Sequence, residues 1–435
     1  MRSESGLVRG VGFLGLCALV INGMVGSGIF ALPYALAQRV GGWTPVVLLA
    51  MGVALIPLVF VMARLAAMFD RTGGPVAFVQ DAFGGNAAFV VGWLQILSVA
   101  SATAANANAL SDYLFGSVAG GTSTLIHAAA TFAGLALAVG LNVMPSRRTA
   151  GVLVLASICK LAPLVLIGLF AWPHLGVAPA STPAETWAPL QAVLLACYAM
   201  IGFENALTMA GEARNPERDM PRALFLVYGL CTLIYALVAA AYCATVFSPG
   251  KADSAPVATL AKALFGDLGG VLVLFAVAWS ILGNMTINML GNSRRIFAME
   301  QQGDLPRGLG RLHPGLSIPI NAVALVGVLT VGLALSGGFV VLAVLSVAAR
   351  LAVYLACVAA LPMVRRRRAL GVLTLEWAAI IAAAGLCGWL ILQSKPENWL
   401  AMAAAVISGL VLRAVARRLR GGGLDRSEAS NAPGA

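Results

Sequence analysis

Hydrophobic residues occur along the chain in long, uninterrupted segments, and polar residues are concentrated in the short gaps between them. A helix needs about 20 apolar residues to cross the ~30 Å hydrocarbon layer of a bilayer, whereas a transmembrane β-barrel shows alternating stretches of about ten. Twelve segments have spanning length, at 11–37, 44–68, 87–115, 124–143, 150–172, 190–211, 222–247, 269–293, 319–336, 339–362, 372–393 and 398–419. The pattern predicts an all-α, polytopic membrane protein with 12 transmembrane helices.

Composition and charge agree with a chain embedded in a membrane. Of its 435 residues 60% are hydrophobic and only 10% charged, against about 25% charged in a typical soluble domain, which excludes an ordinary soluble enzyme or a disordered chain. With the N-terminus inside, 22 of the 28 Lys and Arg residues fall on the cytoplasmic side. We therefore expect a multi-pass protein of the cytoplasmic (inner) membrane with both termini in the cytoplasm. The arginines are spread over all the cytoplasmic loops, so no nucleic-acid-binding face is expected.

Reactive side chains form no cluster that indicates catalysis. The seven cysteines all lie within spans without a CxxC pair, and the three histidines lie at span ends or in loops. We expect no metal site, no cofactor and no catalytic residue, and a membrane-embedded enzyme is disfavoured because it needs matched acidic or Ser/His groups at one depth. No Walker motif is present, which disfavours ATP-driven transport by this chain alone.

Two spans carry sequences that break a helix in mid-membrane. Between Asn22 and Phe30 lie Gly23, Gly26 and Gly28, and each glycine costs about 1 kcal/mol in a helix relative to alanine. An unwound segment survives in a membrane only where protein or a water-filled cavity satisfies its N–H and C=O groups. Close helix packing through small residues is the alternative, but such packing does not place Gly26, Ser27 and Gly28 in succession.

The sixth span contains a second break, at Gly202-Phe203-Glu204-Asn205. An ionisable side chain at this depth costs about 2.5–3.5 kcal/mol and indicates function, although Glu204 could also serve only as an interhelical hydrogen-bonding group. Breaks in spans one and six imply two five-helix repeats, at 11–172 and 188–362, and because five is odd the second repeat must be inverted. Paired broken helices of this kind indicate a transporter site. Spans eleven and twelve (372–419) lie outside the repeats, and the tails 1–10 and 420–435 are cytoplasmic, with disorder expected in the second.

Six motifs occur along the chain, within the spans and between them, in an order typical of one family. They are Gly26-Ser27-Gly28-Ile29-Phe30; Thr72-Gly73-Gly74-Pro75 with Ala82-Phe83-Gly84; Lys160-Leu161-Ala162-Pro163; Gly202-Phe203-Glu204; Gly211-Glu212-Ala213-Arg214-Asn215-Pro216; and Gly303-Asp304-Leu305-Pro306. The chain thereby resembles the amino acid–polyamine–organocation superfamily, whose members share the leucine-transporter-type fold. The resemblance implies a secondary active transporter of L-amino acids, here with a neutral side chain, that works by alternating access.

The resemblance also implies a set of substrate-binding residues at the breaks. The substrate carboxylate would meet the N–H groups and hydroxyl around Gly26, Ser27, Gly28 and Ile29, at the positive end of a helix dipole. The ammonium would meet the carbonyls of Met24, Tyr198 and Ile201, and the aromatic side chain of Tyr198 would close over the substrate, unless it only packs. The residues concerned are Met24, Tyr198 (the aromatic), Ile201, Gly202, Phe203 and Glu204.

Lys160 is the only lysine inside a span. In relatives with a lysine at this point the ammonium takes the place of a sodium ion, and burial makes such a lysine able to exchange a proton. The resemblance therefore implies that Lys160, with Glu204, couples transport to a proton, or that Lys160 fixes the broken helix in an exchanger. The alternative is that its side chain reaches up to the membrane surface.

Other polar side chains within spans could line the site. Asn284, Asn288 and Asn292 follow one another at helical spacing, and Asn288 is expected to reach the substrate, although hydrogen bonding between helices would explain the stripe as well. Ser98 and Thr103 of the third span could also contribute hydroxyls. Arg350 of the tenth span could pair with Glu204 or with a helix end. An exchanger or exporter of amino acids or polyamines remains the alternative function, and a sensor or scaffold with a transporter fold is a more distant one.

Overall fold

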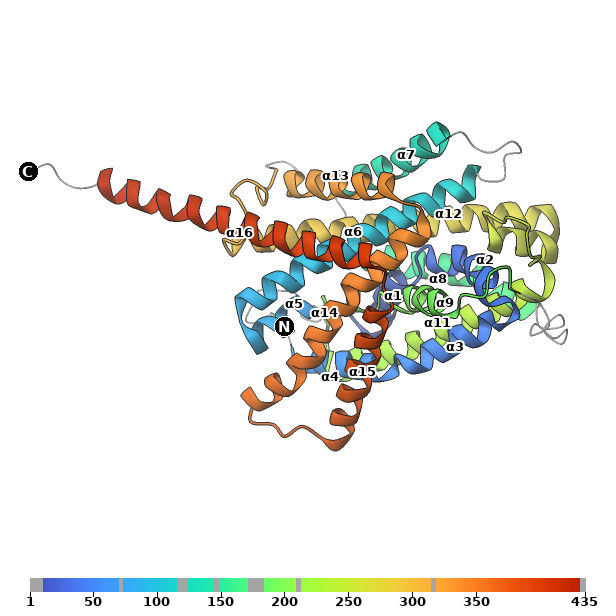
Figure 1. The fold of residues 1–435 in the computed structure, drawn as a ribbon, viewed down its shortest axis with the longest axis horizontal. Helices are drawn as coiled ribbons and strands as arrows, with labels where there is room; N and C mark the ends of the chain where they lie inside the picture. The colour runs from blue at the N-terminus through green and yellow to red at the C-terminus, as the bar shows by residue number, and fades with distance from the viewer. Residues whose placement is uncertain are drawn as a thin grey trace, which may run out of the picture.

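The computed structural model describes residues 11–69, 73–115, 124–143, 149–170, 184–208, 213–313 and 318–430, and these fold into packed helices (Figure 1). Only one isolated β-bridge, between Val11 and Ala213, is found in the described part. The predicted tail 1–10 and the motif residues Thr72, Gly211 and Glu212 lie outside the described residues. The last helix enters the segment 420–435, whose predicted disorder stays a prediction, and residues 431–435 are not described.

The segment predicted as the first repeat forms eight α-helices, of which α1 and α2 together correspond to the broken first span. A short 3-10 helix, Gly41–Trp43, joins α2 to α3, and α5 is a short connecting helix before the third span. The helices are α1 (Phe13–Met24), α2 (Gly28–Val40), α3 (Thr44–Ala54), α4 (Ile56–Met68), α5 (Pro75–Phe83), α6 (Gly85–Phe115), α7 (Thr124–Val143) and α8 (Thr149–Phe170).

The remaining helices form the second predicted repeat and two helices that follow it. The broken sixth span corresponds to α9 and α10, and the long α12 has a kink at Gly266. The helices are α9 (Pro189–Met200), α10 (Glu204–Leu207), α11 (Pro216–Thr245), α12 (Pro256–Gln301), α13 (Ile320–Ser336), α14 (Phe339–Arg367), α15 (Thr374–Leu392) and α16 (Pro396–Ser430). Four of them, α9, α11, α12 and α16, begin with proline, which costs nothing where no intrahelical N–H bond is lost.

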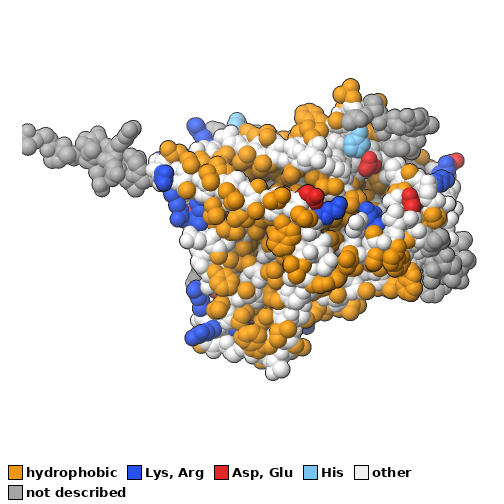
Figure 2. All heavy atoms as spheres, in the orientation of Figure 1, with side chains coloured by type: hydrophobic (Ala, Val, Ile, Leu, Met, Phe, Trp, Pro, Cys, Tyr) orange, Lys and Arg blue, Asp and Glu red, His pale blue; other side chains and the backbone are white. Residues whose placement is uncertain are grey.

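Many of the described helices are long and apolar enough to cross a membrane. Eight helical stretches meet this criterion, and Phe13–Met24, Leu125–Leu141, Ser157–Phe170 and Ile320–Ser336 are shorter apolar helices. One of the eight, Gly28–Met68, joins the second half of the predicted first span to the whole of the second. The all-α membrane architecture is confirmed, whereas the count of 12 stays a prediction. Large apolar side chains such as Leu125, Phe275 and Leu400 are exposed, and Figure 2 shows a face made mostly of hydrophobic side chains with few charged ones between them.

The helix packing supports two related halves. The last helix of the first half, α8, packs against the broken α1, and the last helix of the second half, α14, packs against the broken α9. Helices α15 and α16 cover α14 and also contact α4 and α6. On α16, Arg413 Nε donates to Asp304 Oδ1 over 2.7 Å, which places the Gly303-Asp304-Leu305-Pro306 motif in a buried link between the two-helix extension and the repeats.

Candidate functional site

The first break leaves backbone donors free at the start of α2. Helix α1 ends at Met24, and α2 begins at Gly28. The amides of Gly28 and Ile29 make no hydrogen bond to any other described residue. The Ser27 amide, in contrast, donates to Asn106 Oδ1 over 3.0 Å. Free N–H groups at a helix start carry partial positive charge and bind anions such as carboxylates.

The second break leaves backbone acceptors free at the end of α9. Ile201 is extended at the C-cap, and Gly202 has a φ of +112°, a conformation that favours glycine. The Gly202 N–H donates to Glu204 Oε2 over 3.0 Å instead of continuing the helix. The carbonyl of Tyr198 consequently accepts no hydrogen bond within the described part of the chain, and neither does that of Ile201, because the Asn205 N–H donates to the Gly202 carbonyl. Such carbonyls are suited to an ammonium group.

The two breaks touch each other through their backbones. A Cβ atom added to Gly23 would lie 2.3 Å from the carbonyl oxygen of Gly202, and one added to Gly202 would lie 2.3 Å from the carbonyl oxygen of Gly23. Carbon and oxygen cannot approach so closely, so only glycine fits at either position without a backbone shift. The glycines that mark the two breaks in the sequence therefore also allow the two breaks to pack directly against each other.

A buried cation from the last helix of each half meets each break. Lys160 of α8 is 1% exposed, and its Nζ donates to the Val25 carbonyl over 3.3 Å. Arg350 of α14 forms an ion pair with Glu204, with 3.1 Å between Nε and Oε1, and its Nε also donates to Ser98 Oγ over 3.1 Å. Glu204 Oε2 accepts a further hydrogen bond of 2.6 Å from the Tyr354 hydroxyl. Of the two partners the sequence offered for Arg350, Glu204 is the one observed.

A small polar cavity of about 30 Å³ lies between the breaks. Six predicted binding residues line it, namely Met24, Gly26, Gly28, Tyr198, Ile201 and Asn288. The other lining residues are Gly23, Ala102, Asn106, Asn205, Asn284 and Arg350. A volume of this size holds one or two water molecules, so the site is closed around too little space for an amino acid.

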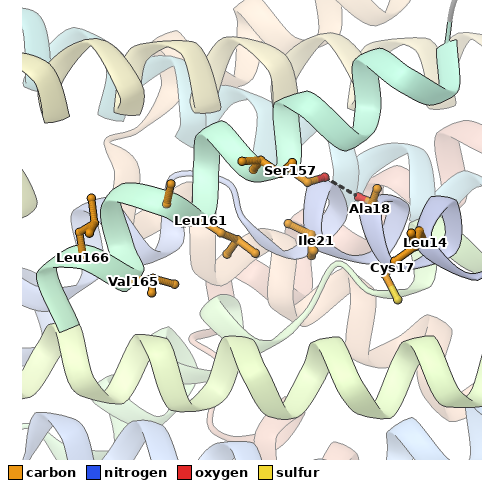
Figure 3. A pocket seen from close by; sticks show the side chains of 10 residues that line it. Leu14, Cys17, Ala18, Ile21, Ser157, Leu161, Val165 and Leu166 are labelled. Carbon is orange, nitrogen blue, oxygen red and sulfur yellow. Dashed lines mark hydrogen bonds between the residues drawn. The ribbon is translucent and has the colours of Figure 1, made fainter. Parts of the chain in front are cut away.

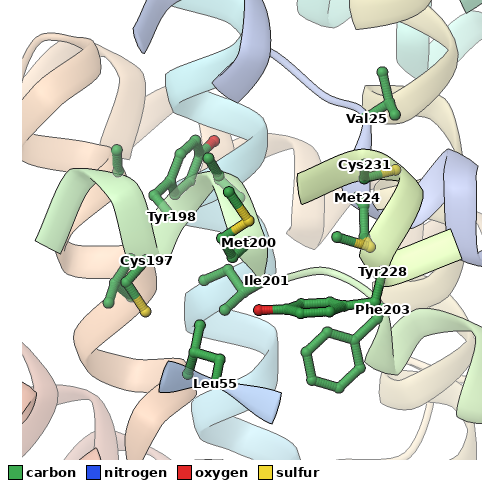
Figure 4. Packing of buried hydrophobic residues seen from close by; sticks show 14 of the residues in the cluster. Met24, Val25, Leu55, Cys197, Tyr198, Met200, Ile201, Phe203, Tyr228 and Cys231 are labelled. Atoms are coloured by element: carbon green, nitrogen blue, oxygen red, sulfur yellow. The ribbon is translucent and has the colours of Figure 1, made fainter. Parts of the chain in front are cut away.

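The remaining predicted residues support the site from behind. Ser27 is fully buried, and its Oγ lies 3.5 Å from the Tyr198 hydroxyl. Phe203 packs its ring edge-on against Tyr228 at 6.1 Å (Figure 4) and stacks on Tyr354. Ile29, Gly202 and Glu204 also lie outside the lining, although they flank it.

Both hydroxyls predicted on the third span are engaged elsewhere. Ser98 Oγ donates to the Ser346 carbonyl over 2.9 Å and accepts from Arg350. Thr103 Oγ1 donates to the Val99 carbonyl of its own helix over 2.7 Å. Neither side chain is among those that line the cavity.

Asn106 is a lining residue that the sequence reasoning did not single out. Its Nδ2 donates to Asn284 Oδ1 over 2.9 Å, Asn288 Nδ2 donates to the same oxygen over 2.8 Å, and Asn284 Nδ2 donates to the Asn22 carbonyl over 2.7 Å. Three amides thus form one network that ends on the amide of Ser27. The available signal was an amide in the middle of an apolar span, which requires a buried partner.

A larger cavity of about 530 Å³ adjoins the small one and shares Gly23, Asn205 and Asn288 with it. Its outer part is lined by the exposed residues Arg294 and Gln302, on the side that the arginine distribution predicts to be cytoplasmic. Tyr198, in contrast, packs edge-on against Phe339 at 5.9 Å, at the start of α14. The small cavity therefore adjoins a larger cavity that reaches the molecular surface.

A third hollow, of about 670 Å³, lies between α1 and α8 and is almost entirely apolar. Figure 3 shows Leu14, Cys17 and Ile21 of α1 facing Leu161 and Val165 of α8. Leu14 is 74% exposed, as expected for a surface that faces lipid. This hollow lacks the polar groups that a zwitterion would need.

Broken helices with complementary free backbone groups, in two halves that repeat the same packing, define a membrane transporter with the leucine-transporter-type fold. The crystal structure of MhsT in complex with L-phenylalanine has this fold and matches with a TM-score of 0.60 at 14% identity, over 91% of this chain and 100% of that one. The model of the family described as amino acid permease matches residues 11–412. The chain belongs to this family, within the amino acid–polyamine–organocation superfamily, whose members are transporters and not enzymes.

Several characterised relatives are amino acid transporters. The serine/threonine exchanger SteT of Bacillus subtilis is 27% identical over 74% of this chain and 75% of its own length. The branched-chain amino acid permease BcaP of the same organism is 24% identical over 75% and 74%. The human large neutral amino acids transporter small subunit 2 is 26% identical over 73% of this chain and 62% of its own length.

Proposed function

We propose that the protein is a secondary active transporter of L-amino acids with a neutral side chain, located in the cytoplasmic membrane with both termini inside. The observation that carries this proposal is that a free backbone donor and free backbone acceptors lie at the same cavity. The Gly28 amide is suited to the substrate carboxylate, and the carbonyls of Tyr198 and Ile201 are suited to its ammonium. The α-carboxylate and the α-ammonium are common to all amino acids, which agrees with the range of substrates named for the relatives.

Transport proceeds by alternating access around the two broken helices. The cavity of about 530 Å³ is the cytoplasmic entrance, and the contact between Tyr198 and Phe339 closes the opposite side. A substrate carboxylate on the Gly28 amide reaches the Ser27 amide as well only if Asn106 releases it, because the carboxylate and the Asn106 carbonyl oxygen compete for the same donor. The small cavity must also widen as the substrate enters.

Lys160 replaces a sodium ion and couples transport to a proton. Its ammonium contacts a carbonyl of the first break, and this is its only hydrogen bond within the described part of the chain. When protonated, Lys160 holds the unwound segment in place, and loss of the proton releases the segment. A side chain that is 1% exposed does not reach the membrane surface, which argues against the alternative that Lys160 extends to that surface.

Amino acid exchange or export is the alternative within the same fold, and the serine/threonine exchanger among the relatives favours keeping it. Polyamine transport has less support. A polyamine requires carboxylates, whereas none of the described residues lining the small cavity is acidic, and Glu204 is engaged by Arg350. The exchange mode and the proton-coupled mode differ in what drives uptake, so one assay separates them.

The test uses purified protein in proteoliposomes with a panel of radiolabelled amino acids. We expect uptake without Na⁺ that is driven by an inwardly directed proton gradient, and counterflow of the same substrates. Uptake that depends only on amino acid inside the vesicle supports the exchanger instead. Absence of counterflow with every amino acid would refute the proposal.

The role of Lys160 is tested by Lys160→Ala in the same vesicles. We expect the variant to keep substrate binding but to lose the stimulation by a pH gradient. Lys262→Ala is the matched control, because Lys262 pairs with Asp267 on the molecular surface, 66% exposed, and is remote from the breaks in sequence. Full pH-dependent uptake by Lys160→Ala would rule out proton coupling through this residue.

A further inference from the structure

Arg350 presents unused hydrogen-bond donors to the small cavity. It lines the cavity and is 5% exposed. Both of its recorded polar contacts, to Ser98 and to Glu204, are made by Nε. Its two terminal nitrogens make no hydrogen bond to any described residue, so the N–H groups they carry are available to a ligand.

The charge of Arg350 is already balanced. Glu204 lies 3.1 Å away and is itself held by the Tyr354 hydroxyl and by the Gly202 amide. The pair is therefore neutral as a unit, and a ligand group that approaches the guanidinium does not need a charge of its own. A neutral oxygen satisfies the donors, whereas a carboxylate would place an additional charge in a buried site.

The other side chains of the cavity are also mainly polar. Asn106, Asn205, Asn284 and Asn288 contribute amides, and Tyr198 contributes its hydroxyl-bearing ring. A purely apolar side chain in this space would leave the free donors of Arg350 unpaired. Sites built to bind a polar group reject apolar analogues strongly for this reason.

We propose that Arg350 contacts the side chain of the transported amino acid, and that the protein selects small, uncharged amino acids whose side chain bears an oxygen atom. Serine, threonine and asparagine have this chemistry. The cavity of about 30 Å³ favours small side chains, because each added methylene group requires further widening. This inference rests on the proposed amino acid transport and specifies its substrate class.

Pairs of amino acids of equal shape test the inference on the unmodified protein. Threonine and valine differ by a hydroxyl against a methyl group, and asparagine and leucine differ by an amide against two methyl groups. In competition with counterflow of a transported amino acid, we expect threonine and asparagine to be effective at concentrations about 10- to 100-fold lower than their apolar partners, the factor for a hydrogen bond to a charged donor.

A paired substitution tests the assignment to Arg350. The double variant Glu204→Gln/Arg350→Met removes both charges together and leaves no unpaired ion. We expect it to lose the preference for threonine over valine. The matched control is Glu376→Gln/Arg365→Met, which alters a buried ion pair between α14 and α15 that is not part of the cavity, and its preference should equal that of the unmodified protein.

Each outcome decides the inference. Valine and leucine competing as well as threonine and asparagine, or aspartate competing best, would overturn it while leaving amino acid transport intact. An unchanged preference in the Glu204→Gln/Arg350→Met variant would overturn the role of Arg350. If that variant does not fold, the ranking by the unmodified protein decides the substrate class, and Arg350→Lys decides the contact, because lysine keeps the charge but loses the planar pair of donors. Counterflow with no amino acid at all would refute the proposed function itself.

Discussion

The ion pair between Glu204 and Arg350 allows a quantitative prediction of stability. The side chains are 1% and 6% exposed, and 3.1 Å separates Oε1 from Nε. Replacing Arg350 by methionine keeps most of the volume but leaves the Glu204 carboxylate buried without a counter-charge. Breaking a buried pair by removing one partner costs about 3–5 kcal/mol.

The neighbouring contacts refine this magnitude. Tyr354→Phe removes the 2.6 Å hydrogen bond to Glu204 Oε2 but leaves the ion pair in place, so its cost should be about 1.5–3 kcal/mol, the range for a hydrogen bond to a charged group. The double variant Glu204→Gln/Arg350→Met contains no unpaired charge. Its free energy of unfolding should therefore be no lower than that of Glu204→Gln alone or of Arg350→Met alone.

The assay is reversible unfolding of the purified protein in mixed micelles with increasing SDS, followed by tryptophan fluorescence. The unmodified protein, Glu204→Gln, Arg350→Met and the double variant form a double-mutant cycle. We expect the coupling energy between the two positions to exceed about 2 kcal/mol. Single-variant losses below about 1 kcal/mol, or losses that simply add in the double variant, would refute the reasoning that the two charges depend on each other.

Three further predictions follow from contacts described above. Gly23→Ala should cost about 1–3 kcal/mol of stability through overpacking, because its Cβ would lie 2.3 Å from a carbonyl oxygen. The midpoint of unfolding in SDS measures this loss. Gly12→Ala is the control, because a Cβ added to Gly12 meets nothing within 4 Å. Asn106→Ala frees the Ser27 amide, so a substrate should inhibit counterflow of a transported amino acid at a concentration at least about fivefold lower than in the unmodified protein. A higher inhibitory concentration would mean that Asn106 itself holds the substrate. Asp304→Asn removes a charge that two arginines of α16 contact and should lower stability by about 3 kcal/mol, with an unchanged KM for uptake.

The broken spans are the part of the site that the sequence predicts best. Glycine runs and a carboxylate in an apolar segment have a local energetic cost, and that cost is visible without knowledge of the fold. Gly26, Gly28, Tyr198 and Ile201, which the family resemblance implied, line the cavity between the breaks, and their role in binding stays a prediction. The meeting of Gly23 with Gly202 is a different matter, because it depends on how the two halves pack.

Side chains on unbroken helices were harder to predict. Ser98 and Thr103 have the right depth, but a hydroxyl on a helix can donate to its own backbone or to a neighbouring helix, as both do here. Asn106 was missed because no other amide side chain lies three or four positions from it in α6, whereas Asn284 and Asn288 follow one another at helical spacing. Arg350 and Glu204 are 146 positions apart, and only the packing of α14 on α9 decides between the partners that the sequence left open.

The contact between Gly23 and Gly202 limits which substitutions the protein can accept during evolution. Each glycine occupies the space that a side chain at the other position would need. Neither position can therefore accept a larger residue on its own, although the two belong to halves of opposite orientation. The contact therefore constrains both halves jointly and permits variation only if the backbone moves.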